Sequence, residues 1–246
     1  MIENAQLISL SRQIALQRQM NVVANNMANI NTSGFKGENI LFEQYEMPVA
    51  RNRDFRPADQ ALSFVQDWAT VHDLAPGAIV QTGNELDMAL NGDGFFAVQT
   101  PGGERWTRSG AFAIDNTGRL VDLNGNAVLG EGGPIQFDPD ENGITIAADG
   151  AISSSAGPKG RLRLVKFANA QQLTRDGANL FSGGTPIPAV GTSVTQGSIE
   201  RSNVSGVAEM AEMIRVTRAY ESVTSLTQKQ DELRRSAIQR LGDANA

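Results

Sequence analysis

The N-terminal stretch MIENAQLISLSRQIALQRQMNVVANNMANIN, residues 1–31, contains neither glycine nor proline. Apolar side chains recur in it at alternating steps of three and four residues, which predicts one long helix. Because Gln and Asn side chains interrupt the apolar row, this helix is expected to be marginal on its own. Thr32, Ser33 and Gly34 follow and predict its end, with Gly34 in a left-handed backbone conformation that most residues avoid.

The C-terminal stretch from Val207 to Leu241 also lacks glycine and proline and predicts a second long helix, for which Ser205 is the expected N-cap. Its apolar residues keep a seven-residue spacing that Gln230 interrupts, as in the seam of a coiled coil. We therefore expect the two terminal helices to pair. The predicted packing seam consists of Leu7, Leu10, Ile14, Met20, Val23, Met27, Val216, Val223, Leu226 and Leu233.

Between the helices, short apolar runs alternate with turn dipeptides such as Asn91-Gly92, Asn124-Gly125 and Asp149-Gly150. This pattern is typical of antiparallel β-structure, and the clearest hairpin joins residues 120–123 to residues 127–129. The expected aromatic core is Phe95, Phe96, Trp106, Phe112 and Phe137. The predicted fold is α+β, with long N- and C-terminal helices paired as a coiled-coil-like unit and a central, mainly antiparallel β-domain.

The same patterns divide the chain into three zones. Residues 1–35 and 203–246 are expected to form one discontinuous helical domain, and residues 76–185 the central β-domain. Residues 36–75 and 186–202 contain several prolines, so they are expected to be irregular, extended connectors.

Composition excludes several classes of protein. The 246 residues include 21 basic and 27 acidic side chains, a net charge of −6, which disfavours nucleic-acid binding. No stretch approaches the roughly 20 apolar residues of a membrane-spanning helix, so no membrane insertion is expected. The N-terminus lacks a basic region and an uninterrupted apolar run, and we expect no cleavable signal peptide.

Catalytic and metal-binding patterns are weak. The chain has no cysteine and one histidine, His72, which we expect to be a connector residue that makes local hydrogen bonds. Residues 138–149 match the ligand spacing of a calcium-binding EF-hand loop, but residues 144–146 predict a strand where that motif needs a helix. The sequence therefore predicts no metal, no cofactor and no enzymatic activity.

Four segments together carry a resemblance to a known family. ANNMANINTSGFKG (24–37) and SNVSGVAEMAEMIRVTRAYES (202–222) resemble the paired terminal signatures of the flagellar rod and hook family. TGNELDMALNGDGFFAVQT (82–100) and the segment 105–130 are similar to the central β-domain of its rod proteins. The similarity is greatest to the proximal-rod members. A distal-rod or hook-type axial subunit remains the nearest alternative.

The resemblance implies a structural subunit of the basal-body rod, which spans the periplasm, transmits torque and conducts export. Its partners would be other rod proteins, copies of itself and the flagellar type III export apparatus. By motif, Asn25, Asn26, Asn29, Thr32, Gly34 and Phe35 would fix the end of the first helix and the turn out of the tube wall, and Arg218, Ala219, Tyr220 and Glu221 would pack helix against helix.

Two other interpretations stay open at this point. Spacing alone also permits an ordinary intramolecular helix pair, in which both apolar seams are satisfied within one chain. A competitor from another class is a periplasmic hydrolase or carbohydrate-binding protein whose β-domain does the chemistry.

Overall fold

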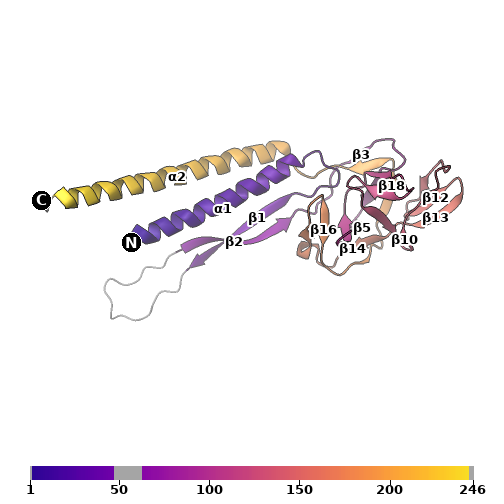
Figure 1. The fold of residues 1–246 in the computed structure, drawn as a ribbon, viewed down its shortest axis with the longest axis horizontal. Helices are drawn as coiled ribbons and strands as arrows, with labels where there is room; N and C mark the ends of the chain where they lie inside the picture. The colour runs from indigo at the N-terminus through magenta and orange to yellow at the C-terminus, as the bar shows by residue number, and fades with distance from the viewer. Residues whose placement is uncertain (1, 47–62, 244–246) are drawn as a thin grey trace. The chain divides into compact units, whose positions relative to one another are not determined.

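The computed structural model describes residues 2–46 and 63–243. Its two long helices are α1 (Ile2–Ala28) and α2 (Gly206–Asp243), at opposite ends of the chain (Figure 1). The strands between them make the fold α+β, as predicted. Helix α1 ends three residues earlier than the sequence pattern indicated, because residues 29–34 form a turn.

The first compact unit consists of residues 1–28, 38–71 and 205–246. In it α1 and α2 run side by side in opposite directions, which confirms the predicted pairing (Figure 1). Two contacts show that the helices are antiparallel. The Asn26 amide, late in α1, lies 3.2 Å from Glu209 Oε1, early in α2, and Gln13 Nε2, earlier in α1, lies 3.2 Å from Thr224 Oγ1, later in α2. Ala15 and Val23 of α1 and Val216 and Val223 of α2 are buried.

The same unit contains a two-stranded sheet of β1 (Glu38–Glu46) and β2 (Ser63–His72), with β1 packed against α1. The sequence predicted an irregular connector over residues 36–75. The β-branched and aromatic residues of these stretches favour strands, and this preference outweighs the flanking prolines. Residues 47–62, the middle of that predicted connector, lie outside the described residues.

The second compact unit, the β-unit, consists of residues 29–37 and 72–204. Its strands are β3 (Ile79–Gln81), β4 (Met88–Asn91), β5 (Phe95–Thr100), β6 (Gly103–Thr107), β7 (Phe112–Ile114), β8 (Leu120–Asp122), β9 (Ala127–Gly130), β10 (Gly133–Pro134), β11 (Thr145–Ile146), β12 (Ala151–Ser154), β13 (Gly157–Arg161), β14 (Leu164–Lys166), β15 (Thr174–Arg175), β16 (Leu180–Ser182), β17 (Ile187–Pro188), β18 (Ser193–Gln196) and β19 (Ser198–Glu200). A short 3-10 helix spans Ala170–Gln172.

Within residues 72–204 the largest sheet has ten strands, in the order β15-β16-β6-β5-β9-β8-β7, with β10, β14 and β17 attached beside it. Strands β11, β12 and β13 form a separate sheet. The predicted hairpin is present as β8 and β9, in which Val121 pairs with Ala127. The strand pairs of this unit are antiparallel, as the turn dipeptides predicted.

The β-unit is held by two apolar clusters. One contains Phe96, Phe112 and Phe137, and the other contains Phe95 and Trp106. All five predicted core aromatics are therefore buried, between 0% and 6% exposed. Phe96 and Phe112 meet edge to face with ring centroids 5.1 Å apart, a favourable geometry for aromatic pairs.

Residues 186–202 also differ from the predicted irregular connector. They include β17, β18 and β19, and the last two pair with β4 and β3. Pro188 is accommodated because β17 pairs on one side only, with β14, and an edge strand tolerates a residue without an N–H. The late strands β18 and β19 thus lie beside the early strands β4 and β3 of the same unit.

His72 and the EF-hand-like string, both singled out in the sequence, have clear positions. His72 ends β2 and is buried, with Nε2 2.9 Å from the Leu173 carbonyl oxygen, so its hydrogen bond is distant in sequence rather than local as expected. Residues 144–146 of the EF-hand-like string were expected to form a strand, and β11 (Thr145–Ile146) lies there. A strand therefore stands where the EF-hand motif needs a helix.

Candidate assembly site

In the first compact unit, the Asn26 side chain lies in the last turn of α1 and is 2% exposed. Its Nδ2 donates to the Glu38 carbonyl at 2.9 Å, and its Oδ1 accepts from the Glu38 N–H at 3.0 Å. The amide therefore pairs with the first residue of β1 as another strand would. Nδ2 also donates to Glu209 Oε1 in the first turn of α2.

The hydrogen bond between Asn26 and Glu209 places the Glu209 carboxyl group between α1 and α2. Burial raises the pKa of Glu209 above its ordinary value, and the hydrogen bond from Asn26 only partly opposes that shift. One Asn side chain thus joins α1, β1 and α2 within the first compact unit.

In the β-unit, the motif residues form the turn that follows α1. The Thr32 N–H and hydroxyl both donate to Asn29, to its carbonyl and its Oδ1 respectively, each at 3.1 Å. Gly34 has a φ of +63°, which confirms the predicted left-handed conformation. A Cβ at Gly34 would also lie 2.3 Å from the Arg108 carbonyl carbon, so this position admits only glycine for two separate reasons.

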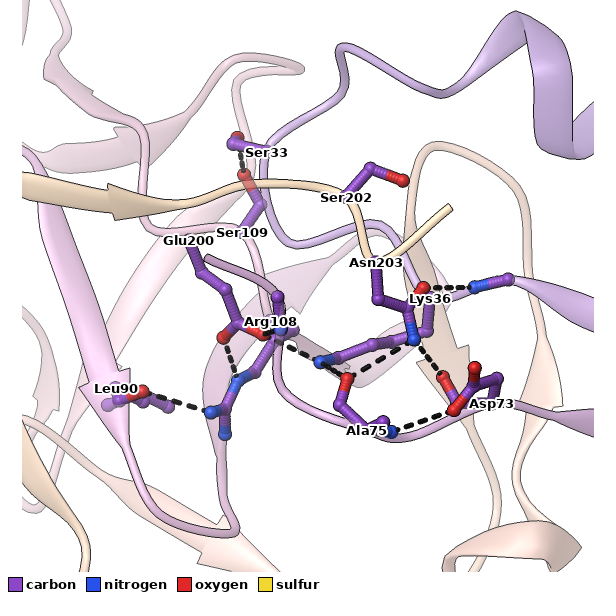
Figure 2. A network of polar contacts seen from close by, with 12 residues as sticks. Ser33, Lys36, Asp73, Ala75, Leu90, Arg108, Ser109, Glu200, Ser202 and Asn203 are labelled. Atoms are coloured by element: carbon purple, nitrogen blue, oxygen red, sulfur yellow. Dashed lines mark hydrogen bonds and ion pairs between the residues drawn. The ribbon is translucent and has the colours of Figure 1, made fainter. Parts of the chain in front are cut away.

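Within the β-unit, Phe35 and its neighbours contact residues that are distant in sequence. The Phe35 side chain is 2% exposed, and the Arg175 guanidinium lies 4.3 Å above its ring, a cation–π contact. Arg175 also donates to the Lys36 carbonyl. The Ser33 and Ser109 hydroxyls lie 2.7 Å apart (Figure 2).

At the centre of this region lies a buried ion-pair cluster, which we define as Lys36, Arg108 and Glu200 (Figure 2). Glu200 accepts from Lys36 Nζ at 2.6 Å, from Arg108 Nε at 2.5 Å and from the Gly77 N–H at 2.8 Å. The three charged side chains are between 1% and 5% exposed. Charges this deep are tolerated only when paired and hydrogen-bonded.

The cluster changes the acidity of its members. Burial alone would raise the pKa of the Glu200 carboxyl, but the Arg108 and Lys36 charges and their hydrogen bonds outweigh burial and hold it below its ordinary value. For Lys36, burial lowers the pKa, and Glu200 compensates only in part. Glu200 is therefore a carboxylate at neutral pH.

Asn203 completes the region near the end of the β-unit. Its Oδ1 accepts from the Gly37 N–H at 2.8 Å, and its Nδ2 donates to the Asp73 carbonyl at 2.8 Å (Figure 2). Nδ2 also lies 3.2 Å from the Ala75 carbonyl. One amide thereby holds three chain segments that are distant in sequence.

Sequence reasoning missed Lys36, Arg108, Glu200 and Asn203 as site residues. A signal for Glu200 exists: in β19, Ser198 and Glu200 are buried while Ile199 between them is only partly buried. Polar residues therefore occupy the inward positions of this strand. A charged residue at an inward alternation position indicates an ion pair, but the sequence does not name its partners.

The remaining motif residues, Asn25 and the four residues 218–221 of α2, differ in how exposed they are. Asn25, Arg218 and Glu221 are exposed, and Ala219 and Tyr220 are partly buried. The structure therefore brings Asn26, Asn29, Thr32, Gly34 and Phe35 into defined contacts. The four consecutive α2 residues point in different directions around their helix.

The predicted seam divides into two groups. Val23, Val216 and Val223 are buried, and Met20 and Met27 are partly buried. The other five are more than half exposed: Leu7 53%, Leu10 52%, Ile14 51%, Leu226 52% and Leu233 71%. In a two-helix pair each helix covers one stripe of its partner, and these residues lie outside that stripe.

Over the described residues, no cluster of three or more His, Cys, Asp or Glu side chains is arranged to hold a metal ion. Within the same ranges, neither helix combines the length and the apolar character needed to cross a bilayer.

Three family models match the chain. They are a flagella basal body rod protein model over residues 7–36, a flagellar hook protein FlgE/F/G D1 domain model over residues 89–154, and a flagellar basal body rod FlgEFG protein C-terminal model over residues 195–240. The first and last models cover most of α1 and α2.

Similar proteins match over nearly the whole chain. The flagellar basal-body rod protein FlgF of Caulobacter vibrioides is 39% identical over 99% of this chain and 100% of its own length. FlgF of Rhizobium meliloti is 35% identical over 96% of each chain. The flagellar basal-body rod protein FlgG of Bacillus subtilis is 31% identical over 88% of this chain and 91% of its own.

Proposed function

The chain belongs to the flagellar basal-body rod protein family, and from this premise we propose that it is a subunit of the proximal rod that assembles with itself and with other rod proteins through its terminal helices. The family is structural and non-enzymatic, so the chain is a structural rod subunit. The alternative of a hydrolase is therefore wrong.

Assembly through the terminal helices is supported by the exposed apolar residues on α1 and α2. Leu7, Leu10 and Ile14 recur on one helix and Leu226 and Leu233 on the other, each more than half exposed. Burying such side chains stabilises an interface by about 25 cal/mol for each Å² of apolar surface. Neighbouring subunits that cover these residues in a repeated, non-closing contact would build a helical tube.

A proximal position is supported by the pattern of relatives. FlgF, which we take as the proximal-rod member of the family, matches 99% of this chain in Caulobacter vibrioides and 96% in Rhizobium meliloti, whereas FlgG of Bacillus subtilis matches 88%. The distal rod is thus the second candidate. In either layer, packed antiparallel helices would transmit torque along their axes, and the assembled tube would conduct exported proteins.

The type III export apparatus is the proposed route to the periplasm-spanning rod. A chain exported through it travels unfolded, and this chain needs no disulfide to fold because it lacks cysteine.

The experiment is a motility assay of the bacterium with the chromosomal copy replaced by Leu226→Asp. A carboxylate in a packed helical seam is costly to bury, so rods should fail to assemble and swimming should be lost. The matched control is Val190→Asp in the β-unit, a residue 82% exposed, which should leave swimming intact. Normal swimming with Leu226→Asp, at normal protein level, would contradict assembly through this helix face.

A further inference from the structure

A cavity of about 570 Å³ lies within the β-unit, beside the buried ion-pair cluster. Three cationic residues line it, Lys36, Arg108 and Lys166, and one acidic residue, Asp93. Its volume falls in the range of small-molecule sites, about 300–1,000 Å³. The rod assembly proposed above assigns no role to this cavity.

The two buried cations keep hydrogen-bonding capacity beyond their partners in the chain. Lys36 Nζ has three N–H groups and donates to Glu200 and to the Ala75 carbonyl. Arg108 has five N–H groups and donates to Glu200 and to the Gly94 and Leu90 carbonyls (Figure 2). Within the described chain, one N–H of Lys36 and two of Arg108 thus have no acceptor.

The charges are unbalanced in the same direction. Lys36 and Arg108 share the single carboxylate of Glu200, so the three protonated and ionised side chains together carry one excess positive charge. The Asp73 carboxylate also attracts Lys36, but Asp73 is exposed and this attraction is the weakest of those on Lys36. Buried donors without acceptors and buried charges without partners are both unfavourable. An anion in the cavity would relieve both.

The remaining wall adds a third cation and an apolar surface. Lys166 ends β14, is partly buried, and finds no acceptor for its ammonium group among the described residues. Phe95 and Phe167 line the cavity, edge to face with centroids 5.8 Å apart. Asp93 is exposed, so its charge is well screened by solvent.

We propose that this cavity binds a small carboxylate that carries an apolar group. The carboxylate is held by Lys166 and by the remaining donors of Lys36 and Arg108, and the apolar group packs against Phe95 and Phe167. A planar carboxylate suits a guanidinium, which can donate two parallel hydrogen bonds to it. Because burial lowers the pKa of Lys36, a bound anion should also shift that pKa upward.

The test is calorimetric titration of the purified full chain with 3-phenylpropanoate, with the uncharged 3-phenylpropanamide and with inorganic phosphate. We expect saturable binding of the carboxylate at one site, and no saturable binding of the amide or of phosphate. Lys166→Gln should weaken carboxylate binding about tenfold, the effect of losing one charge-assisted hydrogen bond.

Arg161→Gln is the matched control, because Arg161 is an exposed cation of the same unit that pairs with Asp149 and does not line the cavity. It should leave the affinity unchanged. The proposal is overturned if the carboxylate does not saturate a site, if the amide or phosphate binds equally well, or if Lys166→Gln and Arg161→Gln weaken binding to the same extent.

Discussion

The Lys36 ammonium lies 2.6 Å from a Glu200 carboxylate oxygen, although the two residues are 164 positions apart in the chain. Lys36 follows the turn after α1, and Glu200 ends β19, the last strand of the β-unit. The pair therefore closes that unit by joining its first segment to its last. Arg108 shares the same carboxylate.

Glu200→Gln should destabilise the β-unit strongly. The substitution leaves Lys36 and Arg108 buried without a counter-charge, and breaking a buried pair in this way typically costs about 3–5 kcal/mol. Hydrogen exchange of the backbone amides in β5, whose residues Phe96 to Val98 are fully buried, reports the free energy of unfolding.

Asp149→Asn is the control for the Glu200 variant. It also removes a carboxylate bonded to an arginine, Arg161, but that pair is about half exposed. Exposed pairs contribute about 0–1 kcal/mol, so β5 exchange should barely change. Equal effects of the two substitutions would mean that the buried cluster does not hold the unit together.

The contribution of Glu200 should depend on pH. Its pKa in the folded protein lies below the ordinary value of 4.5, so its stabilisation is fully present above about 4.5 and is lost as the pH falls through the folded pKa. Stability should therefore fall less steeply in Glu200→Gln than in the wild type between pH ~6 and ~3. Urea unfolding across this range measures both slopes. The same slope of stability against pH in Glu200→Gln and in the wild type would contradict a lowered pKa of Glu200.

The sequence predicted the elements that depend on local pattern. A run without glycine or proline gave both helices, and Asn124-Gly125 between apolar triplets gave the β8–β9 hairpin. The left-handed conformation of Gly34 was predictable because few residues other than glycine end a helix in this way.

The features that depend on contacts distant in sequence were not predictable. β18 and β19 pair with β4 and β3 across about a hundred residues, and the two prolines at 186 and 188 disguised these late strands as a connector. Nor does any local pattern join Glu200 to its two cations. Half of the predicted seam residues stay exposed instead of packing between α1 and α2. The periodicity of a sequence identifies an apolar stripe on a helix, but it does not show which partner covers that stripe.

Gly34→Ala and Gly83→Ala separate backbone conformation from close packing. Both glycines have a positive φ, +63° and +78°, and alanine in that region costs about 1–2 kcal/mol. Only at Gly34 would the new Cβ meet the backbone of Arg108 and Ser109, at 2.3 to 2.4 Å, whereas nothing lies within 4 Å of it at Gly83. Gly34→Ala should therefore lose clearly more stability in urea unfolding. Similar losses would show that the turn shifts freely.

Asn26→Ala should release the start of β1 from α1. The substitution removes both hydrogen bonds between the Asn26 amide and the Glu38 backbone, and each buried backbone group left unpaired costs about 1–3 kcal/mol. The Glu38 amide should then exchange with solvent at least tenfold faster, since 1.4 kcal/mol is a factor of ten. Asn21→Ala, at an exposed position of the same helix, is the control and should not alter that exchange.

Asn26→Asp distinguishes hydrogen bonding from side-chain volume at this position. Aspartate keeps an acceptor for the Glu38 N–H, but it loses the donor and places a carboxylate against Glu209, whose pKa burial already raises. Two adjacent carboxyl groups cannot both ionise without cost, so Asp should be worse than Ala at neutral pH and should recover as the pH falls and one of them takes a proton. The Glu38 amide chemical shift, followed by NMR against pH, measures this recovery. A flat response would mean that Asn26 acts only by filling space.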